Sequence, residues 1–210
     1  LWSICYPGRR QALVPPDTAK ESESGWIRRL GRGKRGDVRR ATSLRASGSL
    51  RVLTSNGHRL LGGYDFDEAL TAYFAQKFQA KHGVDPLEEL KFYQDFRDRA
   101  EQAKKELSDT EETYVNLSAA GKFLDLKLQR SEFESLIRHY IDQTQDLTET
   151  ALKDAGLASK GVDKVLLVGG STRIPLVRQM VRDLTGREPE TGINPDEIVA
   201  IGAAVYAANK

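Results

Sequence analysis

Hydrophobic and polar positions follow regular periods from Val52 onward, and the first of these predicts an amphipathic helix. Its apolar stripe, at intervals of three and four residues, consists of Phe66, Leu70, Tyr73, Phe74 and Phe78. We expect Asp65 to cap this helix, with Glu68 three residues later, and Gly83 to end it. A second, more charged helix is predicted over about 86–107.

Period-two alternation predicts a β-hairpin after these helices. Polar neighbours separate the apolar positions, which are Thr113, Val115 and Leu117 in one strand and Leu124, Leu126 and Leu128 in the other. A turn-like Ala-Ala-Gly-Lys sequence lies between the two strands. Helix, helix and hairpin together define a subregion of about 64–130.

The remaining residues, about 131–210, predict a strand–helix subregion. Capping-box spacing between Ser131 and Glu134 starts a helix that ends at Gly156, and a buried strand follows over 164–168. Two further helices are predicted, over 173–185 and 195–208. The last begins at an Asn-Pro-Asp-Glu sequence that is typical of a helix start, and its almost wholly apolar composition predicts burial. The fold class is therefore mixed α/β.

The first fifty residues show no such period and carry most of the basic charge. They contain nine Arg and two Lys against two Asp and two Glu, a net charge of +7, whereas residues 51–210 hold 21 basic and 26 acidic side chains, a net charge of −5. Such a segment buries too little surface to offset its ordering entropy, so we expect residues 1–51 to be unstructured. It is interpreted as a basic arm for nucleic acid, an unstructured tail, or an out-of-frame translation.

Composition excludes several kinds of site. Cys5 is the only cysteine, so no disulfide within the chain and no cysteine metal site can form. The three histidines show no metal-ligand spacing, and we expect no bound metal. No apolar run reaches the roughly 18 residues that cross a bilayer, and no signal sequence is recognisable. We therefore expect a reducing, cytoplasmic setting and no membrane partner.

The segment Val165-Leu-Leu-Val-Gly-Gly-Ser-Thr-Arg-Ile-Pro175 has the layout of a nucleotide site. A buried strand leads into Gly169 and Gly170, and Ser171 or Thr172 can cap the helix that follows. Glycines allow a ligand to touch the backbone, and a helix N-terminus offers free N–H groups. A tight strand-to-helix turn without a ligand has the same layout. It is not a Walker A loop, because no Gly-Lys-Ser/Thr follows.

A second candidate is the polar face formed by Glu101, Lys104, Lys105 and Ser108. Their spacing places all four on one face of the charged helix, opposite Ala100, Ala103 and Leu107. An acid can accept from sugar hydroxyls, a cation can lie along a ring, and a hydroxyl can bond a ring nitrogen. A solvated face with Glu–Lys pairs remains the alternative.

Three further positions are candidates for ligand binding or close packing. The planar guanidinium of Arg173 can stack on a base, or it can simply be exposed near a helix start. Gly62 and Gly63, just before the first helix, suit a phosphate or a tight turn. Gly202, on the apolar last helix, is interpreted as a site of close helix packing.

Taken together, these segments resemble lobe II, the C-terminal lobe of the nucleotide-binding domain in DnaK-type (70-kDa) heat-shock chaperones, which belong to the actin-like (ribonuclease H-like) ATPases. The resemblance covers 52–210. It rests on the segments Leu61-Gly-Gly-Tyr-Asp-Phe-Asp67, Arg99-Ala-Glu-Gln-Ala-Lys-Lys-Glu-Leu-Ser108, Val165 to Pro175, and Asn194-Pro-Asp-Glu-Ile-Val-Ala-Ile-Gly-Ala-Ala-Val-Tyr-Ala207.

The resemblance implies a role for each candidate residue. Glu101 and Lys104 would meet the ribose, Ser108 would bond the adenine, and Lys105 and Arg173 would flank the base. The ribose and phosphate side would be lined by Gly169, Gly170 and Ser171, with Gly62 and Gly63 approaching the phosphates. Ile174 belongs to the adenosine motif, and Asp196 would lie beside it. The last helix would connect the two lobes.

The sequence also departs from the family pattern. The phosphate loops and the lysine of lobe I are not found in it, nor is a peptide-binding domain, and Tyr64 replaces a usual acid. We therefore expect a truncated lobe II that binds ATP or ADP as part of a protein-folding chaperone and does not hydrolyse ATP alone. Mg²⁺ is expected only in the complete family site, and nucleotide-exchange and J-domain co-chaperones are the implied partners. Alternatives are a non-enzymatic module that docks exchange partners, and a basic-arm binder of nucleic acid.

Overall fold

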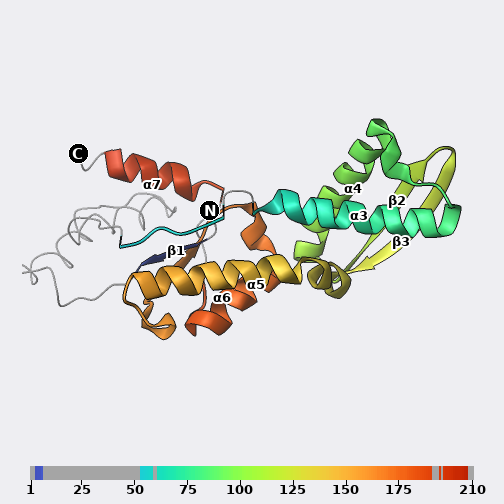
Figure 1. Cartoon of the computed structure of the whole chain (residues 1–210). Helices are drawn as coiled ribbons and strands as arrows, with labels where there is room; N and C mark the ends of the chain where they lie inside the picture. Colours follow the sequence, from blue (N-terminus) through green and yellow to red (C-terminus); the bar gives the residue numbers. More distant parts are fainter. Residues whose placement is uncertain (1–2, 7–52, 59–60, 191–193, 195, 208–210) are drawn as a thin grey trace, which may run out of the picture. The chain divides into compact units, whose positions relative to one another are not determined.

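The computed structural model describes residues 3–6, 53–58, 61–190, 194 and 196–207, which form two compact units (Figure 1). The first unit comprises Leu1–Ser55, Ala151–Thr172 and Val181–Lys210, and the second comprises Asn56–Thr150 and Arg173–Met180. Each unit is assembled from segments that lie apart in the sequence, and the helices α5 (Arg130–Asp154) and α6 (Pro175–Thr185) contribute residues to both.

The predicted stripe of the first helix is confirmed in α3 (Gly63–His82). Phe66, Leu70, Phe74 and Phe78 are fully buried. Gly83 ends the helix in the left-handed region, at φ 70°, as expected.

The start of α3 corrects the prediction that Asp65 is its N-cap. Gly62 holds that position, and Asp65 lies in the first turn, where its carboxylate accepts the Gly62 N–H at 2.7 Å. The Asp65 carboxylate therefore accepts the N–H of the N-cap residue from inside the helix, because an acid at the third helical position can reach back to the cap.

The charged helix is divided where a single helix over 86–107 was expected. Pro86–Glu88 form a short 3₁₀ turn (η2), whose start Asp85 caps, and α4 then runs over Leu90–Asp109. α4 packs along α3, and the Phe78 and Phe96 rings meet edge to face with 5.6 Å between centroids. Inward-facing Ala100, Ala103 and Leu107 are buried, as the helical period predicts.

The predicted hairpin is confirmed by β2 (Glu112–Ala119) and β3 (Lys122–Gln129), which pair antiparallel. Burial alternates along β2, so one face of the hairpin packs on α4 while the other is exposed. The two-residue turn places Ala120 at φ 48° and Gly121 at φ 72°. Positive φ at both central residues matches the right-handed twist of the strands that the turn connects.

The helix α5 begins at Arg130, directly after β3, and not at a Ser131 cap. The Gln129 N–H donates to Glu132 at 3.0 Å, so Glu132 and not Glu134 reaches back to the helix start. The reason is that the cap lies at Gln129 and not at Ser131, two residues early, which moves the position that faces the cap from Glu134 to Glu132. Within the second unit, α5 packs on α3 through Phe66 and Tyr140, whose rings are 5.8 Å apart.

In the first unit, the predicted strand is observed as β4 (Lys164–Leu167), followed by the short 3₁₀ turn η4 (Gly170–Arg173). β4 pairs antiparallel with β1 (Ser3–Tyr6), which lies in the segment expected to be unstructured. The prediction for 1–51 is therefore wrong at these four residues. The backbone of β4 supplies hydrogen-bond partners that a single-sequence period cannot reveal. Residues 7–52, with the Arg-rich stretch, lie outside the described part.

The last two helices differ from prediction at their starts. Helix α6 begins at Pro175, so neither Ser171 nor Thr172 caps it. Helix α7 covers Ile198–Ala207, and Asn194 caps the turn before it by accepting the Asp196 N–H at 3.0 Å.

The prediction that the last helix is buried is wrong for its described residues. Val199 is 59 % exposed, and a Cβ built on Gly202 would have no described heavy atom within 4 Å. Close packing at Gly202 is thus not observed, because among the described residues no surface covers this helix. The apolar composition of α7 predicted that other residues cover it, and the described residues do not. No described helix is long and apolar enough to cross a membrane.

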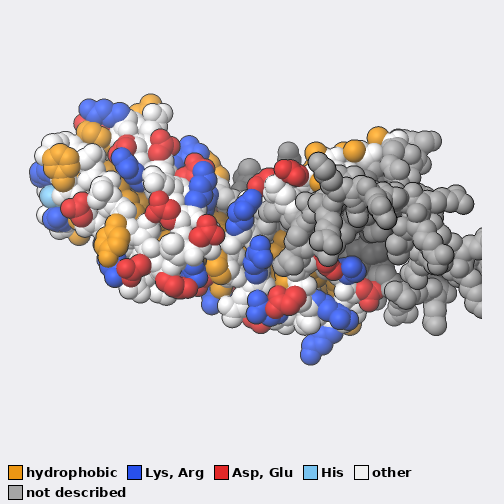
Figure 2. Space-filling model, turned by 180° about the vertical axis from the view of Figure 1, so that it is seen from behind, with side chains coloured by type: hydrophobic (Ala, Val, Ile, Leu, Met, Phe, Trp, Pro, Cys, Tyr) orange, Lys and Arg blue, Asp and Glu red, His pale blue; other side chains and the backbone are white. Residues whose placement is uncertain are grey.

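Acidic and basic side chains are spread over the face of the second unit that Figure 2 draws. On the face drawn in Figure 2, hydrophobic side chains come to the surface there as separate spots among acidic and basic ones. The largest exposed apolar side chains of this unit include Leu90, Tyr114 and Phe123, at 71 %, 68 % and 72 % exposure.

The hairpin turn provides a stability test. Replacing Ala120 with Asn should raise the free energy of unfolding by about 1 kcal/mol, because Asn adopts the left-handed region more readily than Ala. Gly121→Ala should lower it by a similar amount through backbone strain alone, since the part of the chain that the structure describes has no heavy atom within 4 Å of the added Cβ. Urea unfolding of both variants measures the effect, and equal stability of the two would contradict it.

Candidate functional site

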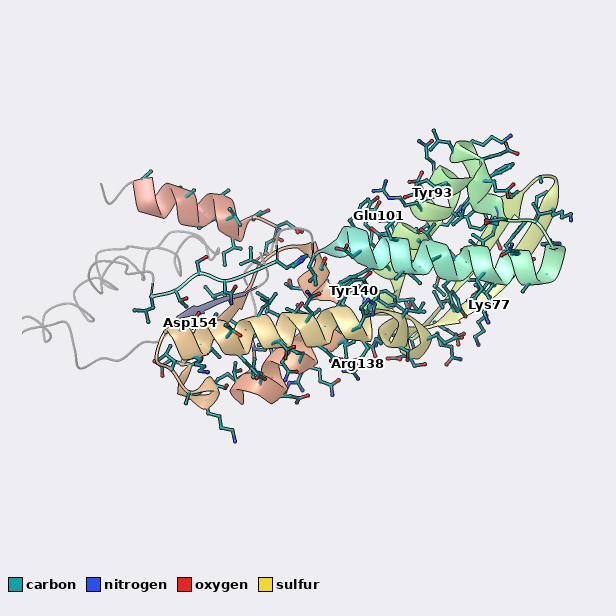
Figure 3. All side chains as sticks on the ribbon, in the orientation of Figure 1. Lys77, Tyr93, Glu101, Arg138, Tyr140 and Asp154 are labelled. Carbon is teal, nitrogen blue, oxygen red and sulfur yellow. The ribbon has the colours of Figure 1, made fainter. Side chains whose placement is uncertain are left out.

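The exposed face of α4 carries the predicted polar groups of the second unit. Glu101 and Lys105 form an ion pair at 2.7 Å, with side chains 49 % and 70 % exposed. Glu101 lies on the part of α4 near the start of α3 (Figure 3). The hydrogen bond from Lys105 lowers the pKa of Glu101, and the same bond raises the pKa of Lys105. Both groups are therefore held in their charged forms, and the carboxylate is a ready acceptor for hydroxyl donors.

Ser108 lies one helical turn beyond Lys104 and is half-buried. Its hydroxyl donates to the Lys104 carbonyl at 3.0 Å. The oxygen keeps acceptor capacity for a further donor, since a hydroxyl has two lone pairs. The interval of seven residues from Glu101 to Ser108 spans two helical turns, about 10 Å, which is on the scale of a nucleoside.

The Lys104 side chain turns toward α3, whereas that of its neighbour Lys105 is exposed. Its ammonium lies 2.7 and 2.8 Å from the two carboxylate oxygens of Asp67 and 3.2 Å from the Gly63 carbonyl. The Lys104 and Asp67 side chains are 13 % and 8 % exposed. The helical spacing predicted the same face for Lys104 and Glu101, but the long side chain turns inward to a buried acid.

Asp67 is a residue that the sequence analysis did not single out, and the structure buries it against Lys104. Burial raises its pKa, while the hydrogen bond and charge of Lys104 oppose the shift. A signal was present in the sequence. Asp67, Thr71 and Ala75 repeat every four residues, and all three are buried on α3. The first two of these, Asp67 and Thr71, are polar and lie one helical turn apart beside an apolar stripe, which predicts a buried polar partner on the next helix.

The Gly62–Gly63 turn is joined to the α4 face through this contact. Gly62 has an extended backbone at φ −170°, and no heavy atom of the described residues lies within 4 Å of where its Cβ would stand. The turn opens the twenty-residue helix α3, whose first backbone N–H groups and positive dipole end favour an anion. Within the second unit, the structure thus brings the glycine turn and the polar face of α4 close together.

A further cluster surrounds Tyr64, the residue that replaces the usual acid of the resembled family. The Arg97 guanidinium lies over the Tyr64 ring, 4.6 Å from its centroid. Tyr93 donates to Glu68 at 2.6 Å, and this hydrogen bond raises the pKa of Tyr93. Tyr64 is 54 % exposed, so this cation–π pair is at the surface beside the start of α3.

The second glycine pair belongs to the first unit. Gly169 follows β4 at φ 94°, a backbone conformation that side chains with a Cβ rarely adopt, so the turn requires glycine. The Gly169 carbonyl accepts from the backbone and the hydroxyl of Thr172, at 3.0 and 2.7 Å. Ser171 is half-buried within η4.

Asp196 lies beside the exposed Gly170 in the first unit. A Cβ on Gly170 would come 3.9 Å from its carboxylate. The glycine turn and this acid are thus neighbours.

Arg173 and Ile174 belong to the second unit. Arg173 is exposed, and Ile174 is buried at 2 % exposure. The predicted site residues are therefore divided between the two units. The second unit holds Gly62, Gly63, Glu101, Lys104, Lys105, Ser108, Arg173 and Ile174, and the first unit holds Gly169, Gly170, Ser171 and Asp196.

Comparison with known proteins assigns the chain to a family. The family model described as Hsp70 protein matches residues 43–209, so the match begins nine residues before Val52. The chain is 42 % identical over 167 residues to the chaperone protein DnaK of Thermosipho africanus (strain TCF52B). It is also 42 % identical over 166 residues to the mitochondrial heat shock 70 kDa protein of Solanum tuberosum.

These matches cover 77 % and 76 % of this chain but only 28 % and 24 % of the two relatives. The chain therefore spans about a quarter of the length of the curated relatives that it matches. A family model that covers most of the chain, together with relatives at this identity, shows that the chain belongs to the Hsp70 family.

Proposed function

We propose that this chain binds an adenosine nucleotide as the nucleoside-binding part of an Hsp70-type chaperone ATPase. The observation that carries the proposal is the arrangement within the second unit. A charged acid–lysine pair and a serine lie along the exposed side of α4, and the Gly62–Gly63 turn opens α3 beside them. Family membership supports adenosine nucleotide as the ligand, because this family consists of chaperones with an ATPase domain.

The roles follow from the chemistry of each group. The Glu101 carboxylate, kept ionised by Lys105, accepts from the ribose hydroxyls. Ser108 bonds the adenine. The long side chain of Lys105 and the planar guanidinium of Arg173 lie along the base, where cations favour an aromatic face. The Gly62–Gly63 turn and the start of α3 receive the phosphates, because free N–H groups and the helix dipole attract anions.

A further group of predicted residues belongs to the first unit, and we propose its contacts for that unit by itself. We propose that the Gly169–Gly170 turn and Ser171 contact the ribose and phosphates and that Asp196 borders the adenosine. Ile174 is assigned to the adenosine side within the second unit. Two features favour this assignment. The turn at Gly169 accepts only glycine, and Gly170 lies against the Asp196 carboxylate without any side chain of its own.

The wider activity belongs to the whole family protein. We infer that the parent activity is ATP-dependent protein folding with Mg²⁺ in the complete site, with nucleotide-exchange and J-domain co-chaperones as partners, in the cytoplasm. In the described part of this chain, no three His, Cys, Asp or Glu side chains are grouped to hold a metal ion. The proposal therefore assigns no ligand of Mg²⁺ to these residues.

A second candidate function is docking of an exchange co-chaperone on the second unit. Leu90, Tyr114 and Phe123 are more than two-thirds exposed, and large exposed apolar side chains are typical of contact surfaces. Binding of such a partner with and without nucleotide distinguishes this function from the first. The basic-arm interpretation concerns residues outside the described part of the chain.

Nucleotide binding can be tested with two variants on the same helix. Glu101→Gln should weaken ADP binding by about tenfold, through loss of a charge-assisted hydrogen bond to the ribose. Asp95→Asn is the matched control, because Asp95 also forms an exposed ion pair four residues along α4, with Arg99. Both variants should change the free energy of unfolding by less than about 1 kcal/mol. Calorimetric titration with ADP measures affinity, and equal weakening in both variants would refute the role of Glu101.

ATP hydrolysis by this 210-residue chain can be tested separately from nucleotide binding. Phosphoryl transfer depends on metal ions and cations that clamp the developing charge. We expect ATP to bind without hydrolysis, so phosphate release should not exceed the rate without protein. A colorimetric phosphate assay with Mg²⁺ checks this. Hydrolysis at the rate of an intact family member would show that the phosphate side of the site is also present.

A further inference from the structure

In the part of the chain that the structure describes, β2 has an outer edge to which no other strand pairs. Residues along an antiparallel strand alternate between those that bond the neighbouring strand and those whose backbone groups point away from it. The Arg130 N–H donates to the Glu111 carbonyl at 2.9 Å, and this bond fixes the alternation for the hairpin. The N–H and C=O groups of Tyr114, Asn116 and Ser118 therefore point away from β3. No described residue is hydrogen-bonded to these groups.

The outer edge of β3 differs, because other groups occupy or protect it. The Phe123 carbonyl lies 3.0 Å from Nε2 of His82. Asp125 and Lys127 follow along the same edge, and charged side chains on an edge strand discourage pairing with another chain. Residues 114–118 of β2 include no charged side chain and no proline, and their pairing with β3 is free of bulges. The edge of β2 is therefore open to a further strand, whereas that of β3 is protected.

The open edge of β2 is complementary to itself about Asn116. When a second copy approaches antiparallel with its own β2, a two-fold axis at Asn116 places Tyr114 opposite the second copy's Ser118. Each such pair can exchange two N–H···O bonds, so this register pairs every outward backbone group of these residues. The two Asn116 carboxamides meet at the axis, where each has a donor and an acceptor for the other. Glu112 falls opposite the second copy's Ala120 in the turn, so no like charges oppose each other.

We propose that two copies of this chain pair along their β2 edges and form one four-stranded antiparallel sheet with a two-fold axis at Asn116. The second copy is the occupant because a closed symmetric pair satisfies both edges at once, and the neutral centre of the edge needs no oppositely charged partner. This interface uses none of the residues proposed for nucleotide binding, so it is independent of that function. The contact is short compared with a standard protein interface, so we expect weak association, with a Kd on the order of 10 µM.

Charges introduced at the axis provide the test. Asn116→Lys and Asn116→Asp should each weaken self-association by about tenfold, because like charges then face each other across the axis. An equimolar mixture of the two variants should associate at least as tightly as the wild-type chain, because the facing charges are then opposite. Gln129→Lys is the matched control, since it adds the same charge as Asn116→Lys at an exposed position on the other strand, and it should leave the Kd unchanged. Sedimentation velocity of the full chain over about 1–100 µM measures the Kd.

Three sedimentation results would overturn the proposal. A chain that sediments as a monomer up to about 100 µM does not pair with itself, and the edge of β2 would then be left to a strand of another protein. A Kd that Asn116→Lys does not change would place the interface elsewhere on the chain. Failure of the mixture to restore association would show that the two Asn116 positions do not face each other.

Hydrogen exchange measured by NMR locates the interface on the backbone. At about ten times the Kd, the amides of Tyr114, Asn116 and Ser118 should exchange about fivefold more slowly than in the dilute chain, because they become bonded to the second copy. The amides of Val115 and Leu117 already bond β3, so their exchange should depend on concentration far less. Slow exchange of the three outward amides in a chain that sediments as a monomer would show that a segment of the same chain covers the edge, and it would overturn the proposal. ADP should change neither result, so the test holds whether or not the chain binds nucleotide.

Discussion

Burial of the phenylalanine-rich stripe of α3 fixes the orientation of the candidate groups in the second unit. Phe66, Phe74 and Phe78 are fully buried, and α4 meets this stripe with its own buried side, Ala100, Ala103 and Leu107. A helix has one rotation that buries such a stripe, so the opposite face must meet solvent. The exposed Glu101–Lys105 pair is therefore a consequence of hydrophobic packing on the other side of α4. Small alanines on the inner side let the two helices approach closely enough for a lysine to reach Asp67.

Local periodicity predicted the elements of the second unit because each of them is specified by its own residues. Alternation along β2 and β3 and the positive-φ turn at Ala120–Gly121 are local properties. The same holds for Gly83 at the end of α3. The polar face of α4 was predicted on the same grounds. Helix starts were less predictable, because Asp65 and Glu132 act from the first turn where the sequence admits several capping arrangements.

Features that depend on distant residues were not predictable from the sequence. The buried pair of Lys104 and Asp67 joins residues 37 apart, and the helical period alone placed Lys104 outside. Pairing of β1 with β4 joins Ser3 to Leu167. The exposed surface of α7 is a third case, because apolar composition indicates what a helix prefers and not which surface is present to cover it. Tertiary context decided all three.

The discontinuous make-up of the two units has a consequence for synthesis on the ribosome. Residues 56–150 emerge as one stretch with their hairpin and most of their core, so this part can begin to fold early. Its last segment, Arg173–Met180, is made only after part of the other unit has appeared. The other unit holds described residues on both sides of this stretch, 3–6 and 196–207, so it needs chain made before and after residues 56–150. No single cut in the gene therefore separates one folded unit from the other.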